Sequence, residues 1–120
     1  MTKVRFDLLE VLAAALDDFD TFQGYKFNLK VWRIKNGCST ICCAMGLAMA
    51  LPEFRNEGLK QLPMGIAYNE FFGFKAASEL LGITEFEAQM LFAPDAYHRH
   101  DDPHIVSTRI RQFADSKRTV

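Results

Sequence analysis

Apolar residues recur every three or four positions over residues 4–19, the spacing of one buried face of an α-helix. These positions are Val4, Leu8, Val11, Leu12, Ala15, Leu16 and Phe19. Asp17, Asp18 and Asp20 follow at the predicted C-terminal end, where the helix dipole disfavours negative charge. The pattern predicts a first helix that stops at these aspartates. A divalent-cation site there is disfavoured because no EF-hand spacing follows.

The next pattern alternates between apolar and polar residues over residues 25–32, which predicts a short, half-buried strand. Lys35, Asn36 and Gly37 then predict a turn. A second extended piece, over residues 59–62, could pair with the first strand as a small two-stranded ribbon.

Residues 38–51 hold all three cysteines and the longest run of small and apolar residues. We expect this stretch to be the buried central helix. Ser39 or Thr40 can cap its start, and Pro52 is expected to end it because proline lacks an amide donor.

The C-terminal half predicts three more helices. One runs from about residue 70 or 74 to residue 81 and ends at Gly82. Thr84 and Glu87 form a capping-box pattern, which predicts a short helix closing at residue 92. Asp102 and Pro103 read as the cap and first position of the last helix.

Together these elements predict one domain over residues 1–120, with residues 115–120 as a frayed tail. The expected fold class is mainly α: a compact bundle of about five short helices around the central cysteine helix. The alternative is an α+β fold with a minor two-stranded ribbon.

Composition and charge narrow the function. The net charge is −1 and the pI is near 6.3, so the composition gives no sign of the excess positive charge that nucleic-acid-binding proteins use to bind a phosphate backbone. We find neither a signal-peptide pattern nor a long uncharged apolar run, so we expect a cytoplasmic protein without a membrane span. In that reducing setting the cysteines are expected to be thiols. Eleven phenylalanines are many for 120 residues and could form a sticky surface as well as a core.

The sharpest chemical candidate is a zinc site, because zinc binds cysteine and histidine in tetrahedral sets. The candidate ligands are Cys38, Cys42, Cys43, His98, His100 and His104. Their spacing argues against such a site, since Cys42 and Cys43 are adjacent and lack a paired-knuckle pattern. Buried structural thiols are the favoured interpretation.

Thiol chemistry is the next alternative. Cys38 near a helix N-terminus would have a favoured thiolate, and Cys42 one turn on could close a reversible disulfide with it. Catalysis by a cysteine and a histidine is permitted by the sequence but not suggested by it. We assign no catalytic residue and no cofactor.

Residues 76–84 followed by a capped helix have the pattern of a helix-turn-helix. The second helix would present Glu85, Glu87 and Gln89 with no cation, and phosphate would repel these acids. We therefore expect this shape to serve packing, and nucleic acid is a disfavoured partner.

A further motif is carried by Phe27, Asn28, Trp32, Cys38, Thr40, Cys43, Ala44 and Gly46. These residues resemble the pattern aromatic-x(4)-Trp followed by Cys-Gly-Thr-x-x-Cys-Ala-x-Gly. That pattern is found in a family of small proteins encoded by tailed phages and prophage-bearing bacteria. The similarity continues to Ile110 and spans about three quarters of the chain. Ser39 replaces the usual glycine, Leu47 replaces a histidine or tryptophan, and Cys42 is extra.

The resemblance implies a shared fold and a phage or prophage setting, with no activity established for the family. It makes Trp32, Cys38, Thr40, Cys43 and Gly46 the structural motif. A glycine inside a helical stretch costs about 1 kcal/mol against alanine, so Gly46 predicts the close approach of another element.

The favoured function is a small non-enzymatic binding protein of phage or prophage type. It would act through an aromatic-rich surface on a protein partner, either a host protein or another copy of itself as a homo-oligomer. The alternatives are a thiol-redox or metal-binding protein that uses Cys38 and Cys43, and a helix-turn-helix-like protein associated with nucleic acid.

Overall fold

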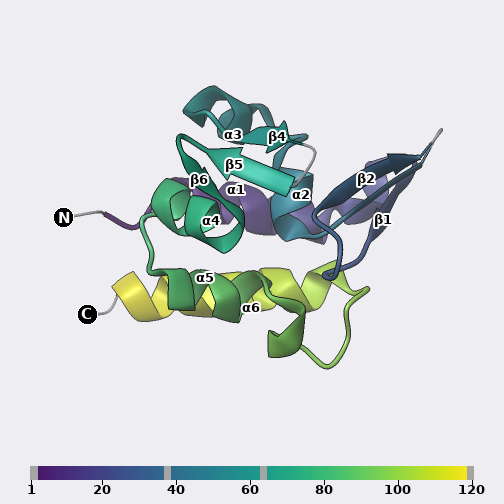
Figure 1. Ribbon diagram of the computed structural model, residues 1–120. Coiled ribbons are helices and arrows are strands. Elements are labelled where there is room, and N and C mark those ends of the chain that lie inside the picture. The colour runs from purple at the N-terminus through teal and green to yellow at the C-terminus, as the bar shows by residue number, and fades with distance from the viewer. Residues whose placement is uncertain (1–2, 37–38, 63–64, 119–120) are drawn as a thin grey trace.

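The computed structural model describes residues 3–36, 39–62 and 65–118 (Figure 1). The helices are α1 Phe6–Asp17, α2 Ala44–Ala48, α3 Pro52–Glu57, α4 Gly73–Leu81, α5 Glu85–Phe92 and α6 Pro103–Arg118. Two 3-10 turns, η1 Phe19–Thr21 and η2 Pro94–Ala96, accompany them. The strands are β1 Tyr25–Phe27, β2 Arg33–Asn36, β3 Ser39–Cys42, β4 Lys60–Leu62, β5 Gly65–Tyr68 and β6 Phe71–Phe72.

The strands form two separate three-stranded sheets. In the first, β3 lies in the centre, parallel to β1 and antiparallel to β2. The second sheet is antiparallel, in the order β4-β5-β6. The first sheet projects from the body of the molecule as an arm, while the second lies against α4 (Figure 1). Below them, α5 lies beside α6, and α6 packs along α1.

The prediction of a mainly α-helical bundle with at most a two-stranded ribbon is wrong. Over the described residues the chain is an α+β protein with six α-helices and two three-stranded sheets. Strands β2, β3, β5 and β6 were missed because each is only two to four residues long. An alternation of apolar and polar residues needs about four to eight residues to be recognised.

The predicted central helix over residues 38–51 is wrong in its first part. Ser39–Cys42 is the central strand β3, whose β-branched Thr40 and Ile41 suit an extended backbone. Only Ala44–Ala48 forms α2, and all five of its residues are buried. A strand enclosed by neighbours on both sides shows the same continuous apolar run as a buried helix, so the pattern alone could not separate the two.

The segment that starts at Pro52 contains a helix, α3, which was not predicted from the sequence. Pro52 occupies the first turn of α3, where its missing amide costs nothing. The extended piece over residues 59–62 is confirmed as β4, but its proposed pairing with residues 25–32 is wrong, because β4 pairs with β5. Of residues 25–32, only Tyr25–Phe27 is a strand.

The signals that the sequence gives for the end of α4 and the starts of α5 and α6 are confirmed. Gly82 ends α4 in the left-handed conformation, with φ of 71°. At the start of α5, the Glu87 amide donates to the Thr84 hydroxyl at 3.0 Å, and the Thr84 amide donates to the Glu87 carboxylate at 2.9 Å. Helix α6 begins at Pro103.

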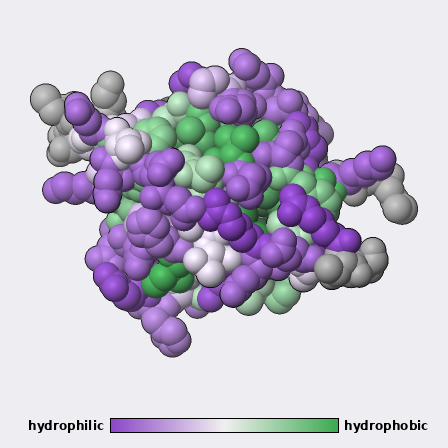
Figure 2. Space-filling view, turned by 180° about the vertical axis from the view of Figure 1, so that it is seen from behind, coloured by the Kyte–Doolittle hydropathy of each residue, from purple (hydrophilic) through white to green (hydrophobic). Residues whose placement is uncertain are grey.

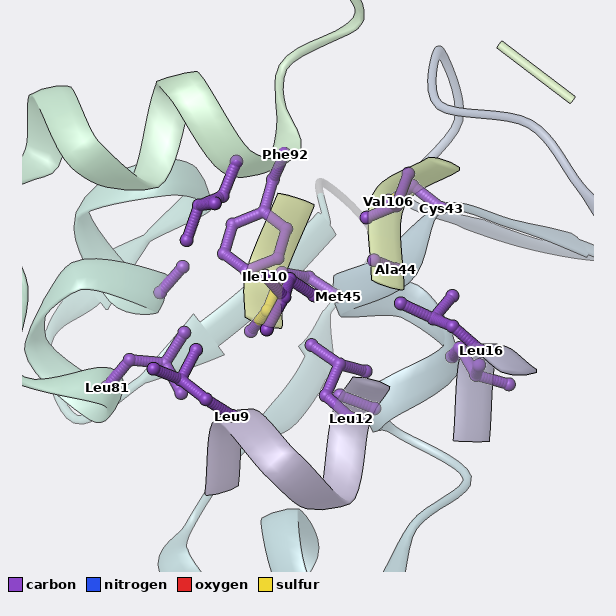
Figure 3. Close-up of a cluster of buried hydrophobic side chains, with 14 of the residues drawn as sticks. Leu9, Leu12, Leu16, Cys43, Ala44, Met45, Leu81, Phe92, Val106 and Ile110 are labelled. Atoms are coloured by element: carbon purple, nitrogen blue, oxygen red, sulfur yellow. The ribbon is translucent and has the colours of Figure 1, made fainter. Parts of the chain in front are cut away.

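The core lies where α1, α2, α4, α5 and α6 meet. Figure 3 shows Phe92 of α5 reaching toward Ile110 of α6 and Met45 of α2. Leu9, Leu12 and Leu16 close this core from the side of α1, and all are fully buried. The short helix α2 is therefore at the centre of the fold. Within the described part of the chain, no helix is both long enough and apolar enough to cross a membrane.

Candidate functional site

Three motif residues, Trp32, Cys43 and Gly46, meet at the junction of the first sheet with α2. The Cys43 amide donates to the Trp32 carbonyl oxygen at 3.3 Å, and the Cys43 Sγ lies 3.7 Å from the same oxygen. A Cβ on Gly46 would come within 1.6 Å of that carbonyl oxygen. Gly46 is thus the position where the approach expected from the sequence takes place, with the Trp32 backbone as the approaching element.

The indole of Trp32 extends the same junction to the second sheet and α4. Its ring lies 5.0 Å from the ring of Phe74, between centroids. Gly65 and Gly73 lie next to the indole. A Cβ on Gly65 would stand 3.1 Å from an indole carbon, and a Cβ on Gly73 would stand 3.7 Å from another. Trp32 therefore joins the arm, the central helix and the second sheet, which is a structural role.

The described cysteines are buried free thiols. Cys42 is fully buried and Cys43 nearly so. Burial, with a further contribution from the neighbouring Cys43, raises the pKa of Cys42 to about 12, although the Arg33 charge acts in the opposite direction. Burial also raises the pKa of Cys43 to about 11. Because the thiolate is the reactive form, both side chains are poor nucleophiles at neutral pH. Cys38 lies outside the described residues.

The three histidines sit in unlike surroundings. His98 is exposed, the His100 Nε2 lies 3.0 Å from the Pro94 carbonyl oxygen, and the His104 Nδ1 lies 3.7 Å from the Asp17 carboxylate. Among the residues that the structure describes, no three side chains of histidine, cysteine, aspartate or glutamate are grouped to hold a metal ion. The six candidate ligands are therefore not brought together as far as the structure describes them.

Thr40, the remaining motif residue, is a buried member of β3, and its amide donates to the Gly24 carbonyl at 2.7 Å. With Trp32, Cys43 and Gly46 it belongs to the framework of the fold. The described motif residues thus hold elements together and leave no reactive group accessible to a substrate.

A groove of about 470 Å³ lies elsewhere, between α5 and α6, which run side by side in Figure 1. From α5 it is lined by Glu87, Met90 and Leu91, and from η2 by Ala96. From α6 it is lined by Arg109, Gln112, Phe113, Ser116 and Lys117. Met90, Leu91, Ala96 and Phe113 give it an apolar floor.

Arg109 is the notable charge of this groove. Its guanidinium carbon lies 4.0 Å from the centre of the Tyr97 ring, and its Nη1 donates to the carbonyls of Ala96 at 2.7 Å and Met90 at 3.3 Å. No carboxylate in the described part of the chain pairs with it. By contrast, Lys117 pairs with Glu87 at 2.5 Å. The groove therefore carries one unneutralised cation.

Large apolar side chains stand exposed around the groove. Phe86 is 70% exposed and Met90, one turn further along α5, is 47% exposed. A second hollow of about 310 Å³ continues along α6 past Arg109 to Ile105, which is 38% exposed. We call the surface formed by Phe86, Met90, Ile105 and the two hollows the α5–α6 face.

A second apolar area is visible from behind the molecule. Figure 2 shows hydrophobic surface gathered in the upper half of this view, where α1 and α3 lie, among hydrophilic side chains. On α1, Ala14 is exposed and Val11 and Ala15 are half-buried. These side chains are small compared with the exposed Phe86 and Met90 of the α5–α6 face.

The two helices of the helix-turn-helix pattern expected from the sequence are α4 and α5. The exposed side of α5 carries Glu85, Phe86, Gln89 and Met90, which are acidic, polar or apolar. A helix of this composition presents no cation to a phosphate backbone.

The residues of the groove were not predicted from the sequence. A signal was available, because the predicted helix over residues 85–92 has apolar residues on all sides, with Phe86 and Met90 one turn apart. An amphipathic surface helix would have only one apolar stripe. Arg109 gave no signal, since its place beside Tyr97 depends on the fold.

Comparisons with protein-family models, with curated proteins and with solved structures yield no match for this chain.

Proposed function

We propose that this chain is a small non-enzymatic binding protein that holds a protein partner on its α5–α6 face. In keeping with the sequence resemblance, we place it among phage or prophage proteins that act in the reducing interior of a bacterial cell. The observation that carries the proposal is the groove of about 470 Å³, with its apolar floor, its unneutralised Arg109 and its exposed Met90. The exposed Phe86 stands one turn from Met90 on α5.

The physical reason is the cost of leaving such a surface in water. Exposed apolar side chains that cluster around a hollow and are rimmed by polar groups are typical of protein interaction sites. Arginine and aromatic residues dominate the energetics of such interfaces. Arg109, stacked on Tyr97, is already held in one orientation, so little side-chain entropy is lost on binding.

The buried thiols favour this proposal over thiol chemistry. A redox or nucleophilic role needs an accessible cysteine with a lowered pKa. Burial raises the pKa values of Cys42 and Cys43 instead. Their contacts with β-sheet and core are those of small hydrophobic residues.

Site-specific photo-cross-linking tests the proposal. Phe86 is replaced by p-benzoylphenylalanine in the full chain, which is expressed in bacterial cells and irradiated. Phe72, 49% exposed on β6, is the matched control position. We expect discrete adducts from position 86 that are weakened when the same chain also carries Arg109→Gln, and no comparable adducts from position 72.

Equal adduct yields at the two positions would show that exposure alone governs cross-linking, and would overturn the proposal. An absence of adducts at position 86 would overturn it as well. The mass of the adduct, read from a denaturing gel and by mass spectrometry, identifies the partner as another protein or as a second copy of the chain.

A further inference from the structure

Helix α5 combines exposed, bulky apolar side chains with an unpaired glutamate at its N-terminal end. Phe86 and Met90 stand one turn apart on its exposed side. Glu85 occupies the first position of the helix, and no cation in the described part of the chain pairs with it. The exposed side of α5 therefore carries both a negative charge and large apolar side chains. These are the features that would complement a groove with an apolar floor and an unpaired cation.

The groove and this helix surface lie on the same face. Met90 belongs to both, since it is exposed beside Phe86 and also lines the groove. Arg109 lies at the C-terminal half of α5, because it donates to the Met90 carbonyl, whereas Glu85 and Phe86 lie at the N-terminal end. The acid and the cation thus mark opposite ends of one short helix.

This arrangement is self-complementary under a two-fold axis. An axis through the neighbourhood of Met90 would set two α5 helices antiparallel, so that the start of each lies over the end of the other. Phe86 of each copy would then enter the groove of the other copy beside Met90. Glu85 would face Arg109 of the other copy, and opposite helix dipoles would lie side by side.

We propose that the occupant of the groove is a second copy of this chain, docked through antiparallel α5 helices, with Phe86 as the anchor and the pair of Glu85 and Arg109 setting the register. The proposal rests on the proposed function in that it takes the α5–α6 face as the binding surface. Burial of one phenylalanine removes roughly 150–250 Å² from water, and two-fold symmetry repeats that gain. The hollow beside Ile105 continues the contact along α6.

Sedimentation velocity of the purified full chain, from low to high micromolar concentration, tests the proposal. We expect a concentration-dependent shift from the 13.7 kDa chain to twice that mass. Phe86→Ser is expected to weaken the association at least about tenfold, because a few anchor residues contribute most of the binding free energy of an interface. Phe72→Ser removes another exposed phenylalanine, from β6, and is expected to leave the association unchanged.

Charge reversal tests the register. Glu85→Arg and Arg109→Glu are each expected to weaken self-association about tenfold, because like charges then face each other. An equimolar mixture of the two variants is expected to restore the dimer, since both ion pairs are complementary in the mixed species. Thermal melts of each variant check that Arg109→Glu remains folded; if it does not, Glu85→Arg and Phe86→Ser decide alone.

A wild-type chain that stays monomeric at every concentration would overturn this inference. The same holds if the dimer survives Phe86→Ser, or if Phe72→Ser breaks it instead. The broader proposed function fails separately, because a monomeric chain that still gives adducts to another protein from position 86 would retain the binding face and lose only the second copy as its occupant.

Discussion

Replacement of Gly46 by alanine is the sharpest test of the framework around Trp32. An ideal Cβ at this position would lie 1.6 Å from the Trp32 carbonyl oxygen, 2.8 Å from its carbonyl carbon and 2.9 Å from the Cys42 Cβ. The first two atoms belong to the backbone, so no side-chain rotation relieves the clash. The arm and α2 would have to separate.

Opposing effects set the magnitude. Alanine is favoured over glycine inside a helix by about 1 kcal/mol. Overpacking costs typically 1–3 kcal/mol and more where the backbone must move. Separation would also weaken the hydrogen bond from the Cys43 amide to the Trp32 carbonyl, which contributes roughly 0.5–1.5 kcal/mol. We expect Gly46→Ala to lower the free energy of unfolding by at least about 2 kcal/mol.

The assay is urea denaturation followed by circular dichroism and by tryptophan fluorescence, which reports on Trp32, the single tryptophan. Ala48→Gly, a buried position of the same helix, is the control for helix propensity and is expected to cost about 1–2 kcal/mol. If Gly46→Ala were as stable as the wild type, the close approach of Trp32 would be refuted.

Other substitutions and conditions test separate parts of the structure. Thr84→Ala should lower the free energy of unfolding by about 1 kcal/mol through loss of the capping box, whereas Thr108→Ala on the exposed side of α6 should change it little, as measured by urea denaturation. Because burial raises the pKa values of Cys42 and Cys43 to about 12 and 11, their contribution to stability is complete below the ordinary thiol pKa and is lost as pH rises through the folded values. These two thiols should therefore not react with a thiol reagent in the folded protein at pH 8. Cys42→Ala should reduce the loss of stability above pH 9. Rapid labelling of Cys43 in the folded state would contradict its burial. The Ser107 hydroxyl and the Arg111 guanidinium lower the pKa of Asp17, so this group stabilises the fold above its ordinary pKa and the effect fades as pH falls. Asp17→Asn should cost up to about 1 kcal/mol at neutral pH and little at acid pH; an equal cost at both would show that the charge is irrelevant.

The end of α4 and the start of α5 were predictable because they depend on local chemistry. Gly82 supplies a left-handed cap, and Thr84 with Glu87 supplies a capping box, whatever the rest of the chain does. The sheets were not predictable, because β3 is defined by partners that come from two other segments, β1 and β2. Its side chains alone suit a buried helix equally well.

The candidate site divides in the same way. The exposed Phe86 and Met90 can be seen in the sequence as apolar residues on the wrong side of a helix. The groove itself requires α6 beside α5 and Arg109 stacked on Tyr97, and both follow from tertiary packing. The cysteines were the main chemical candidates in the sequence, and Cys42 and Cys43 are buried in the core as free thiols.

The central claim is that the α5–α6 face is where this protein binds. Its most direct test is the ratio of photo-adduct yields from benzoylphenylalanine at position 86 and at position 72 in cells. A ratio well above one that falls when Arg109→Gln is added is the predicted result. A ratio near one, or one unaffected by Arg109→Gln, would contradict it.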